Sequence, residues 1–461
     1  MAGHCHPAEQ HNDDPAVNDE SWVGNIGCVV PEMVEWLASS DGRAVLEFVT
    51  VVDDDAHLRA SRGDASAVDA LKLANAIAKH FPDLDRGLAA AALTQVQLRR
   101  KAAGRLGPHA SELLYTRDGL EQASRLVVAQ LRAGRYRDAG VESVADLGCG
   151  IGLDSIAFSL AGIAVTAIER DPTVAAIARA NAAAVGVSDR LTVVEADVTD
   201  PDTLTLTLSR VDAIFLDPAR RDIASQAGGR SQRTLDPQAW SPPWSWAAAL
   251  AERSPRMAAK VAPGIPHELT PDGGCTTWTS VDGDLVEAEV AWPALNTAGV
   301  RRRAVVIRRD VAHELSSAIS LEAEPRASIG TIGNWIMEPD DAVIRAGLIA
   351  TLAERIDARF IDPQVAYLTS DDEPPPSPFM AAFRVDEALP YSLDSLRRAL
   401  TARGVGQVVV KKRAITIDPD DVRKRLKLPK AEGKATVVIT RIGTDPWAYI
   451  CAPRARAIPD E

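Results

Sequence analysis

The chain has 461 residues and a formal net charge of -13, and 46% of its residues are hydrophobic. This length is enough for two or three domains, and the hydrophobic content is ordinary for proteins with buried cores. Five scattered cysteines without C-x-x-C spacing argue against a disulfide framework and against a cysteine zinc site. The sequence contains neither a basic and apolar leader nor an apolar run of about 18 residues, so we expect a cytoplasmic protein that does not enter the membrane.

Residues 1–30 are predicted to be disordered, because Pro15 and the acids around it support no packed core. Four possible metal ligands occur in this segment: His4, Cys5, His6 and His11. We interpret these four residues as part of a polar, disordered start of the chain, and we expect no metal. From residue 31 to 135, apolar side chains recur every three or four residues, as at Trp36 and Leu37, which predicts an all-α region.

A predicted strand, glycine turn, helix and second strand follow one another between residues 142 and 169. The turn has glycine at three alternate positions, Gly148, Gly150 and Gly152. Because glycine has no Cβ that would collide with a ligand, the backbone can pass directly beneath one here. The helix that starts after these glycines directs its first amides at that ligand. Glu169 ends the second strand, where an acid would accept hydrogen bonds from both hydroxyls of a ribose.

A dinucleotide site is the main alternative for such a glycine turn, and two features argue against it. The dinucleotide fingerprint is G-x-G-x-x-G, whereas Leu153 occupies the position of its third glycine here. Asp146, at the end of the first strand, would repel a pyrophosphate but suits the cationic amino group of a methionine moiety. The segment therefore predicts a pocket for S-adenosylmethionine.

The run from Asp146 to Gly152 resembles the first motif of the class I, Rossmann-like methyltransferases that depend on S-adenosylmethionine. The resemblance extends over residues 110–310 and implies that Glu169 binds the ribose of the cofactor. It also implies that Asp197, after the third predicted strand, binds the adenine amino group. Alternating β-rich runs and Ala-rich helices independently predict a parallel α/β sheet. Later runs that would complete the sheet are 256–261, 276–281, 285–292 and 303–309.

The resemblance places methyl transfer at the end of the fourth predicted strand, at Asp217, Pro218 and Arg220. These residues resemble the D-P-P-[YFW] motif of enzymes that methylate exocyclic amines, but Ala219 and Arg220 replace the second proline and the aromatic residue. Asp217 can still align an amine or accept its proton, since attack on a sulfonium needs alignment more than a strong base. Because the aromatic side chain is missing, a methyltransferase core that has lost its catalytic activity is an alternative interpretation.

Two other groups offer alternative chemistry near this edge. Trp240, Trp244 and Trp246 would supply stacking for a base, although the prolines among them favour loop anchors. Cys275 is the candidate for a covalent nucleophile, but no neighbouring base or helix start accompanies it, which favours a small strand residue.

Residues 114–124 predict a short helix with Thr116 as its N-cap. A segment shortly upstream of the first strand packs beside that strand in related methyltransferases, notably the trimethylguanosine synthases. This resemblance implies that Thr116, Glu121 and Gln122 close over the methionine end of S-adenosylmethionine. A plain capped helix is the other interpretation.

The segment from Arg397 to Arg441 has 13 lysines and arginines against four acids, a net charge of +9 that leaves -22 for the rest of the chain. Such a basic segment in an acidic protein predicts a phosphate-binding surface, with a solvated charged face as the alternative. A strand at 408–410, a basic helix at 418–428 and a strand at 436–441 are expected. The predicted contacts to RNA are Lys411, Lys412, Arg413, Arg423, Lys424 and Arg425.

This basic segment resembles the THUMP-like domain that ends a family of bacterial class I methyltransferases, in which a helical segment also precedes the catalytic domain. Together with the composition and periodicity of the first 135 residues, the resemblance indicates an α/β chain with four parts: disordered 1–30, helical 31–135, methyltransferase 136–312, and a small α+β THUMP-like domain at 326–455. It implies tRNA or rRNA as the partner and methylation of a base as the reaction. The alternatives are an RNA-binding or regulatory protein with a degenerate core, and a methyltransferase for protein or a small molecule.

Overall fold

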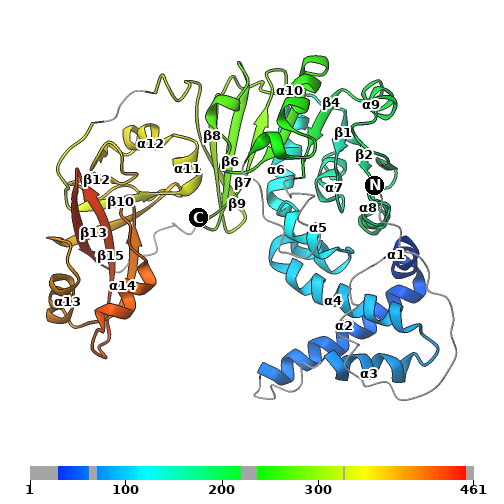
Figure 1. Cartoon of the computed structure of the whole chain (residues 1–461), viewed down its shortest axis with the longest axis horizontal. Helices are drawn as coiled ribbons and strands as arrows, with labels where there is room; N and C mark the ends of the chain where they lie inside the picture. The colour runs from blue at the N-terminus through cyan, green and yellow to red at the C-terminus, as the bar shows by residue number, and fades with distance from the viewer. Residues whose placement is uncertain (1–29, 62–69, 220–235, 325–327, 453–461) are drawn as a thin grey trace. The chain divides into compact units, whose positions relative to one another are not determined.

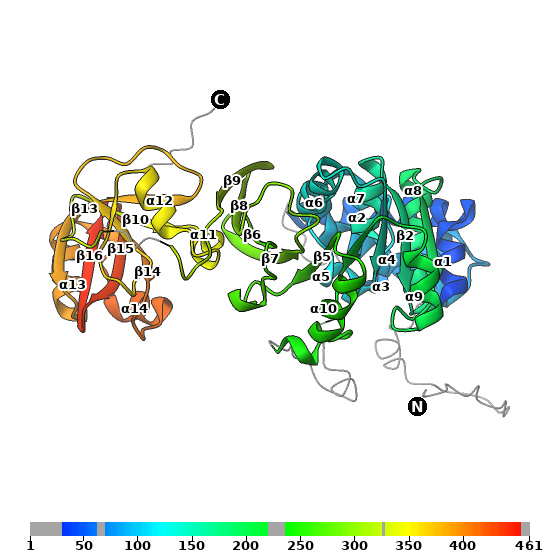
Figure 2. The same ribbon diagram turned by 90° about the horizontal axis from the view of Figure 1, so that it is seen from above.

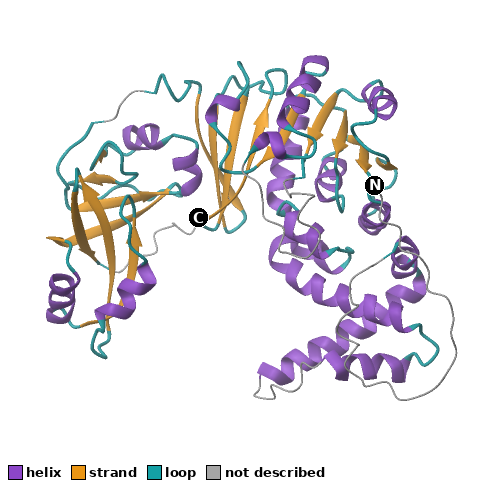
Figure 3. Ribbon diagram, in the orientation of Figure 1, coloured by secondary structure: helices purple, strands orange, loops and turns teal. Residues whose placement is uncertain are grey.

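The computed structural model describes residues 30–61, 70–219, 236–324 and 328–452. The predicted disordered start therefore lies, except for its last residue, outside the described residues. The chain forms two compact units. The first comprises the chain up to Ala123 together with Asp171–Gly186, and the second comprises Ser124–Arg170 and the chain from Val187 onward. Figure 1 follows the chain through both units, and Figure 3 distinguishes their helices from their strands.

The first unit contains helices and no strand among its described residues, as predicted for the N-terminal region. Its helices are α1 (Pro31–Ala38), α2 (Ser40–Ser61), α3 (Ala70–His80), α4 (Arg86–Leu106), η2 (Gly107–Ser111), α5 (Arg117–Gln122) and α8 (Pro172–Val185). Buried apolar residues such as Val45, Val49 and Ile77 recur along α2 and α3 at helical spacing. Asp85 caps α4, because its carboxylate accepts hydrogen bonds from the first backbone amides of that helix.

Two buried side-chain amides fix the backbone that precedes α5. The side chain of Gln95 donates to the carbonyl of Tyr115 at 2.8 Å and accepts from its amide at 2.9 Å. Asn181 of α8 makes the same pair of bonds with Leu114, at 3.0 and 2.7 Å. These bonds satisfy backbone groups that burial would otherwise leave unpaired, so residues 114–115 are held firmly just before the predicted N-cap.

The second unit contains a nine-stranded sheet with the order β3-β2-β1-β4-β5-β7-β6-β8-β9. Its strands are β1 (Ser143–Leu147), β2 (Ala164–Glu169), β3 (Leu191–Glu195), β4 (Ala213–Leu216), β5 (Met257–Val261), β6 (Cys275–Val281), β7 (Asp284–Ala291), β8 (Arg302–Arg308) and β9 (Val311–Ser317). The accompanying helices are α6 (Leu126–Asp138), α7 (Leu153–Leu160), α9 (Pro201–Leu208), η4 (Pro237–Ala239), α10 (Trp244–Arg253) and η5 (His267–Leu269). The predicted α/β architecture is confirmed, and β9 is a strand that the sequence did not indicate.

Strands β3, β2, β1, β4 and β5 are parallel, and the strand order reverses between β1 and β4. Open parallel sheets bind ligands beyond the carboxyl ends of their strands at such a reversal. Four of the predicted site residues, Asp146, Gly148, Glu169 and Asp217, lie at or just after the ends of β1, β2 and β4. The topology therefore gathers these residues at one edge of the sheet.

A second, seven-stranded sheet has the order β11-β12-β10-β13-β16-β15-β14. Its strands are β10 (Trp335–Pro339), β11 (Arg359–Phe360), β12 (Leu368–Ser370), β13 (Met380–Pro390), β14 (Val405–Lys412), β15 (Gly433–Ile442) and β16 (Asp445–Cys451), and its helices are α11 (Asp341–Arg345), α12 (Ile349–Arg355), α13 (Leu393–Ala402) and α14 (Pro419–Leu426). Alternate residues of β15 enter different cores: Val437 and Ile439 pack with α13 and α14, and Val438 packs on the opposite face. Figure 2 shows α13 and α14 beside these strands. Strand β14 forms the edge of the sheet and, among the described strands, pairs only with β15.

No helix within the described part of the chain is both long enough and apolar enough to span a membrane.

Candidate functional site

The turn after β1 has a backbone that favours glycine at all three predicted positions. Gly148, Gly150 and Gly152 have φ angles of 83°, 55° and 85°, in the left-handed region. A Cβ added to Gly148 would lie 3.2 Å from the main-chain oxygen of Asp217. The glycine turn is therefore in close contact with the end of β4, and α7 begins directly after Gly152.

The acids at the ends of β2 and β3 both accept hydrogen bonds from backbone amides. The amide of Gly150 donates to Oε2 of Glu169 at 3.1 Å, so this carboxylate holds the glycine turn. Asp197 is exposed and accepts from both the amide and the hydroxyl of Thr199, at 2.8 and 2.7 Å. These bonds from Thr199 lower the pKa of Asp197. Both acids lie at the strand ends at which the sequence predicted contacts to ribose and adenine.

Asp146 is a buried acid at the end of β1 with one unsatisfied oxygen. The Ser155 hydroxyl donates to Oδ2, whereas Oδ1 has no hydrogen-bond partner among the residues that the structure describes. Burial, followed by the charge of nearby Asp154, raises the pKa of Asp146 to about 7. A cation bound close by would satisfy the charge of this carboxylate, so the site fits the ammonium of the methionine moiety of S-adenosylmethionine.

Asp217, directly after β4, forms an ion pair that the sequence did not predict. Its Oδ2 lies 2.5 Å from Nζ of Lys260, on the neighbouring strand β5. Ala219 then exchanges two backbone hydrogen bonds of 2.9 Å with Ser241. Pro218 lies between these two contacts, and the predicted residue Arg220 falls outside the described residues. The only sequence signal for Lys260 is a single lysine in an otherwise apolar strand.

A buried charge network lies behind this edge of the sheet. The fully buried guanidinium of Arg132 on α6 donates to Asp154, Glu287 and, at 2.6 Å, Glu289. The hydroxyl of Ser124 donates to Asp154 at 2.9 Å and accepts from Nζ of Lys260 at 3.4 Å. The pair formed by Asp217 and Lys260 is thus connected to helices α6 and α7 and to strand β7.

Thr116 and Gln122 belong to the first unit. Thr116 is the N-cap of α5, since its hydroxyl accepts the amide of Gly119 at 2.9 Å. Gln122 is the last residue of that helix. Their contact with the methionine end of S-adenosylmethionine stays a prediction.

The alternative groups for stacking and covalent catalysis are engaged in the core. Trp240 and Trp244 are buried, and Trp244 stacks on Trp292 with ring centroids 5.4 Å apart. These contacts support the interpretation of the tryptophans as anchors. Cys275 is buried, and burial raises the pKa of its thiol, which opposes formation of a nucleophilic thiolate.

Most of the predicted RNA-binding cations are paired with acids of the same sheet domain. Lys411 lies 2.5 Å from Glu338, and Arg413 lies 3.1 Å from Asp341. Arg423 and Arg425 pair with acids of their own helix, Asp420 and Asp421. Lys412 and Lys424 have no acidic partner in the described part of the chain. The six residues therefore differ in how far they are available to a phosphate.

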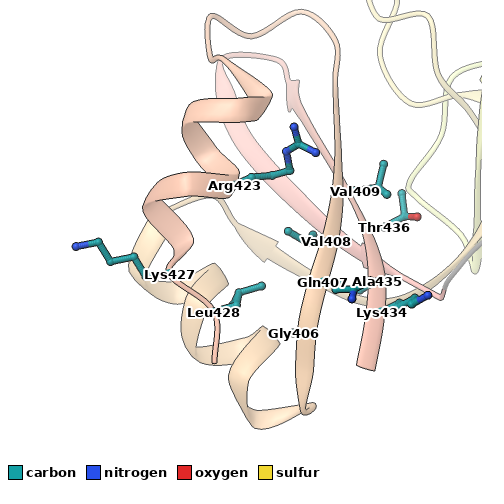
Figure 4. A pocket seen from close by; sticks show the side chains of 10 residues that line it. All are labelled: Gly406, Gln407, Val408, Val409, Arg423, Lys427, Leu428, Lys434, Ala435 and Thr436. Carbon is teal, nitrogen blue, oxygen red and sulfur yellow. The ribbon is translucent and has the colours of Figure 1, made fainter. Parts of the chain in front are cut away.

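A hollow of about 720 Å³ lies between α14 and the edge strand β14. Its lining residues are Gly406, Gln407, Val408, Val409, Arg423, Lys427, Leu428, Lys434, Ala435 and Thr436. Figure 4 shows Arg423 reaching toward β14 and Lys427 pointing away from it. The lining contains three cations and no acid, and the residue Val409 is 56% exposed. We call this feature the β14 groove.

Among the residues that the structure describes, no three histidine, cysteine, aspartate or glutamate side chains gather in an arrangement that could hold a metal ion.

Two family models match separate parts of the chain. Residues 141–245 match the model described as RNA cap guanine-N2 methyltransferase. Residues 380–453 match the model described as THUMP domain-like. The first match covers the glycine turn and Asp217, and the second covers the β14 groove.

Curated proteins and a solved structure resemble most of the chain. An uncharacterized S-adenosylmethionine-dependent methyltransferase of Mycobacterium tuberculosis, found in strains CDC 1551 / Oshkosh and ATCC 25618 / H37Rv, is 33% identical over 369 residues. The match covers 77% of this chain and 95% of the relative. The crystal structure of a putative methyltransferase from Porphyromonas gingivalis W83 is 21% identical with a TM-score of 0.64, and the match covers 81% of this chain and 92% of that one. This structure shows the same fold.

The raised pKa of Asp146 predicts a pH dependence of cofactor binding. The ionised carboxylate attracts an ammonium, so binding requires Asp146 to lose its proton when the pH lies below about 7. We expect the affinity for S-adenosylmethionine to rise about tenfold between pH 5.5 and 7, where the ligand amine keeps its charge. Calorimetry at several pH values would measure this, and Asp146→Asn should remove most of the dependence. An equally steep dependence in Asp146→Asn would contradict the assignment.

Glu169 provides a second test of the pocket. Glu169→Ala removes the expected ribose bonds, roughly 1.5–3 kcal/mol each, so the affinity for S-adenosylmethionine should fall about 10-fold to 100-fold. Glu169→Gln is the matched control, because it keeps an oxygen that can accept from Gly150 and from one hydroxyl, and its affinity should fall less. Unchanged affinity in Glu169→Ala, measured by calorimetry, would exclude the ribose role.

Proposed function

Because the chain belongs to the S-adenosylmethionine-dependent methyltransferases, we propose that it methylates an exocyclic amine of a base in tRNA or rRNA. The observation that carries this proposal is the β14 groove, whose lining includes Arg423, Lys427 and Lys434 and no acid. The surrounding segment has a net charge of +9 in a chain that is otherwise strongly acidic. Such segregated positive charge favours a polyanionic substrate over a protein or a small molecule. RNA as the acceptor would place the reaction in the cytoplasm.

The cofactor is held, in this proposal, at the reversal of the strand order between β1 and β4. The glycine turn lets the ligand approach the backbone, Glu169 binds the ribose, and Asp146 faces the charge of the amino group. When bound, S-adenosylmethionine supplies a methyl group on a positively charged sulfur. Asp197 would bind the adenine amino group beyond β3.

We assign the positioning of the acceptor amine to Asp217, which Pro218 and Arg220 follow in the sequence. The carboxylate of Asp217 accepts an N–H bond from the amine, which directs the nitrogen lone pair at the methyl carbon and provides a place for the proton that leaves. The matched family model at 141–245 supports an exocyclic amine, because guanine N2 is such a group. Arg220 follows closely in the chain and would add a positive charge near the acceptor.

A substitution at Asp217 tests the catalytic part of the proposal. Asp217→Ala should leave the affinity for S-adenosylmethionine within about threefold and lower methyl transfer to RNA by about 100-fold or more, because the side chain acts on the transition state. Transfer of labelled methyl groups to total RNA from a strain lacking the enzyme would measure this. A wild-type protein that is inert toward RNA but active on protein or small-molecule pools would contradict RNA as the acceptor, and inertness toward all three would favour a binding or regulatory role.

A double substitution in the β14 groove tests RNA binding. Lys427→Ala with Lys434→Ala should weaken binding of all RNA sequences alike, since phosphate contacts position the ligand without specifying it. The log-log salt slope should flatten by about 0.7–0.9 for each lysine–phosphate interaction that the substitutions remove. Lys79→Ala with Lys101→Ala is the matched control, because it removes the same charge from exposed sites of the first unit. If the control alters the slope and the groove variant does not, RNA recognition lies in the helical region instead.

A further inference from the structure

Lys260 is a buried cation in the apolar strand β5, and it adjoins the acid that the proposed function uses. Its side chain is 4% exposed, and its strand neighbours Ala258, Ala259 and Val261 are fully buried. An ammonium is costly to bury unless carboxylates compensate it. Its position is therefore determined by the acids around it.

Carboxylates and a hydroxyl lie around the ammonium of Lys260. Oδ2 of Asp217 lies 2.5 Å from it, and the hydroxyl of Ser124 lies at 3.4 Å. Burial alone would lower the pKa of Lys260, but Asp217, Asp154 and Glu287 outweigh burial and raise it above its usual value. Lys260 therefore keeps its positive charge at neutral pH.

The two oxygens of Asp217 differ in their contacts. Oδ2 is bound by Lys260 from the interior, whereas Oδ1 has no hydrogen-bond partner within the described residues. The side chain of Asp217 is 25% exposed, compared with 4% for Lys260. Asp217 is thus held from the protein side, and its second oxygen is left for a group outside the sheet.

We propose that Lys260 is a positioning residue for methyl transfer, which fixes Oδ2 of Asp217 so that Oδ1 receives the acceptor amine. This inference rests on the proposed function. In the reaction, the nitrogen lone pair forms the new N–C bond, the pair of the S–C bond stays on sulfur, and the proton that leaves the nitrogen passes to Oδ1 of Asp217. Lys260 contacts neither the methyl group nor the amine, and it acts by restricting the rotation of the Asp217 carboxylate.

A double-mutant cycle in the full-length protein tests this role. Lys260→Met and Asp217→Ala should each lower kcat with total RNA at saturating S-adenosylmethionine, with Lys260→Met costing about 10-fold or more. In the Asp217→Ala background, Lys260→Met should lower kcat by no more than about a further twofold, because the group that it positions is already absent. Cofactor affinity, from calorimetry, should stay within about threefold in all variants. A Lys260→Met protein as active as wild type, or an equal decrease in both backgrounds, would overturn the inference.

Arg135→Gln is the control, because it removes an ion pair of the same network, the 2.9 Å pair with Glu289, that involves neither Asp217 nor Lys260. It should lower the melting temperature and leave kcat within a few-fold of wild type.

If Lys260→Met does not fold, the cycle is measured with Lys260→Arg, whose planar guanidinium cannot occupy the same place as an ammonium. Wild-type kcat in Lys260→Arg, or an equal decrease with and without Asp217→Ala, would then overturn the role. A wild-type protein inactive on RNA contradicts the proposed function itself, whereas an active wild type with an insensitive Lys260 contradicts this inference alone.

Discussion

Burial of the Arg132 guanidinium is the constraint on which the edge of the first sheet depends. The charge is fully removed from water, and three carboxylates, from Asp154, Glu287 and Glu289, compensate it. Removing one partner of a buried ion pair typically costs about 3–5 kcal/mol, because the remaining charge is left uncompensated. The network therefore ties α6, α7 and β7 together in one arrangement, and through Ser124 the same arrangement reaches Lys260.

Two buried acids near this edge of the sheet have pKa values shifted in opposite directions. Glu289 is buried, which would raise its pKa, but Arg135 and Arg132 outweigh burial and lower its pKa to about 2. Asp146 has no such cation in contact among the described residues, and burial raises its pKa to about 7. The protein thus keeps one carboxyl group near the cofactor turn that changes charge around neutral pH, while Glu289 behind it stays ionised.

The cations of the second sheet domain differ in whether an acid already pairs with them. Lys411 and Arg413 pair with acids on β10 and α11, so they contribute to the packing of the sheet domain. Lys427 and Lys434 line the β14 groove and have no acidic partner among the described residues. An unpaired cation retains its attraction for a phosphate, whereas a paired one must first give up its acid. The groove, more than the basic end of β14, is therefore the surface suited to a polyanion.

The sequence alone determined the strand, glycine turn and helix at residues 143–160, the acid at the end of β2 and the succession of strands from β1 to β8 along the chain, because spacing and backbone preference are local properties. It also placed Asp217 after β4. It did not reveal Lys260 as the partner of Asp217, 43 residues away, or Arg132 as the partner of Glu287, 155 residues away. A buried charge is compensated by whichever acid the strand order brings next to it, and the order β4-β5-β7 is set by packing of the whole sheet. The tertiary structure alone likewise decided which cations of the basic segment are paired and which remain open to a phosphate.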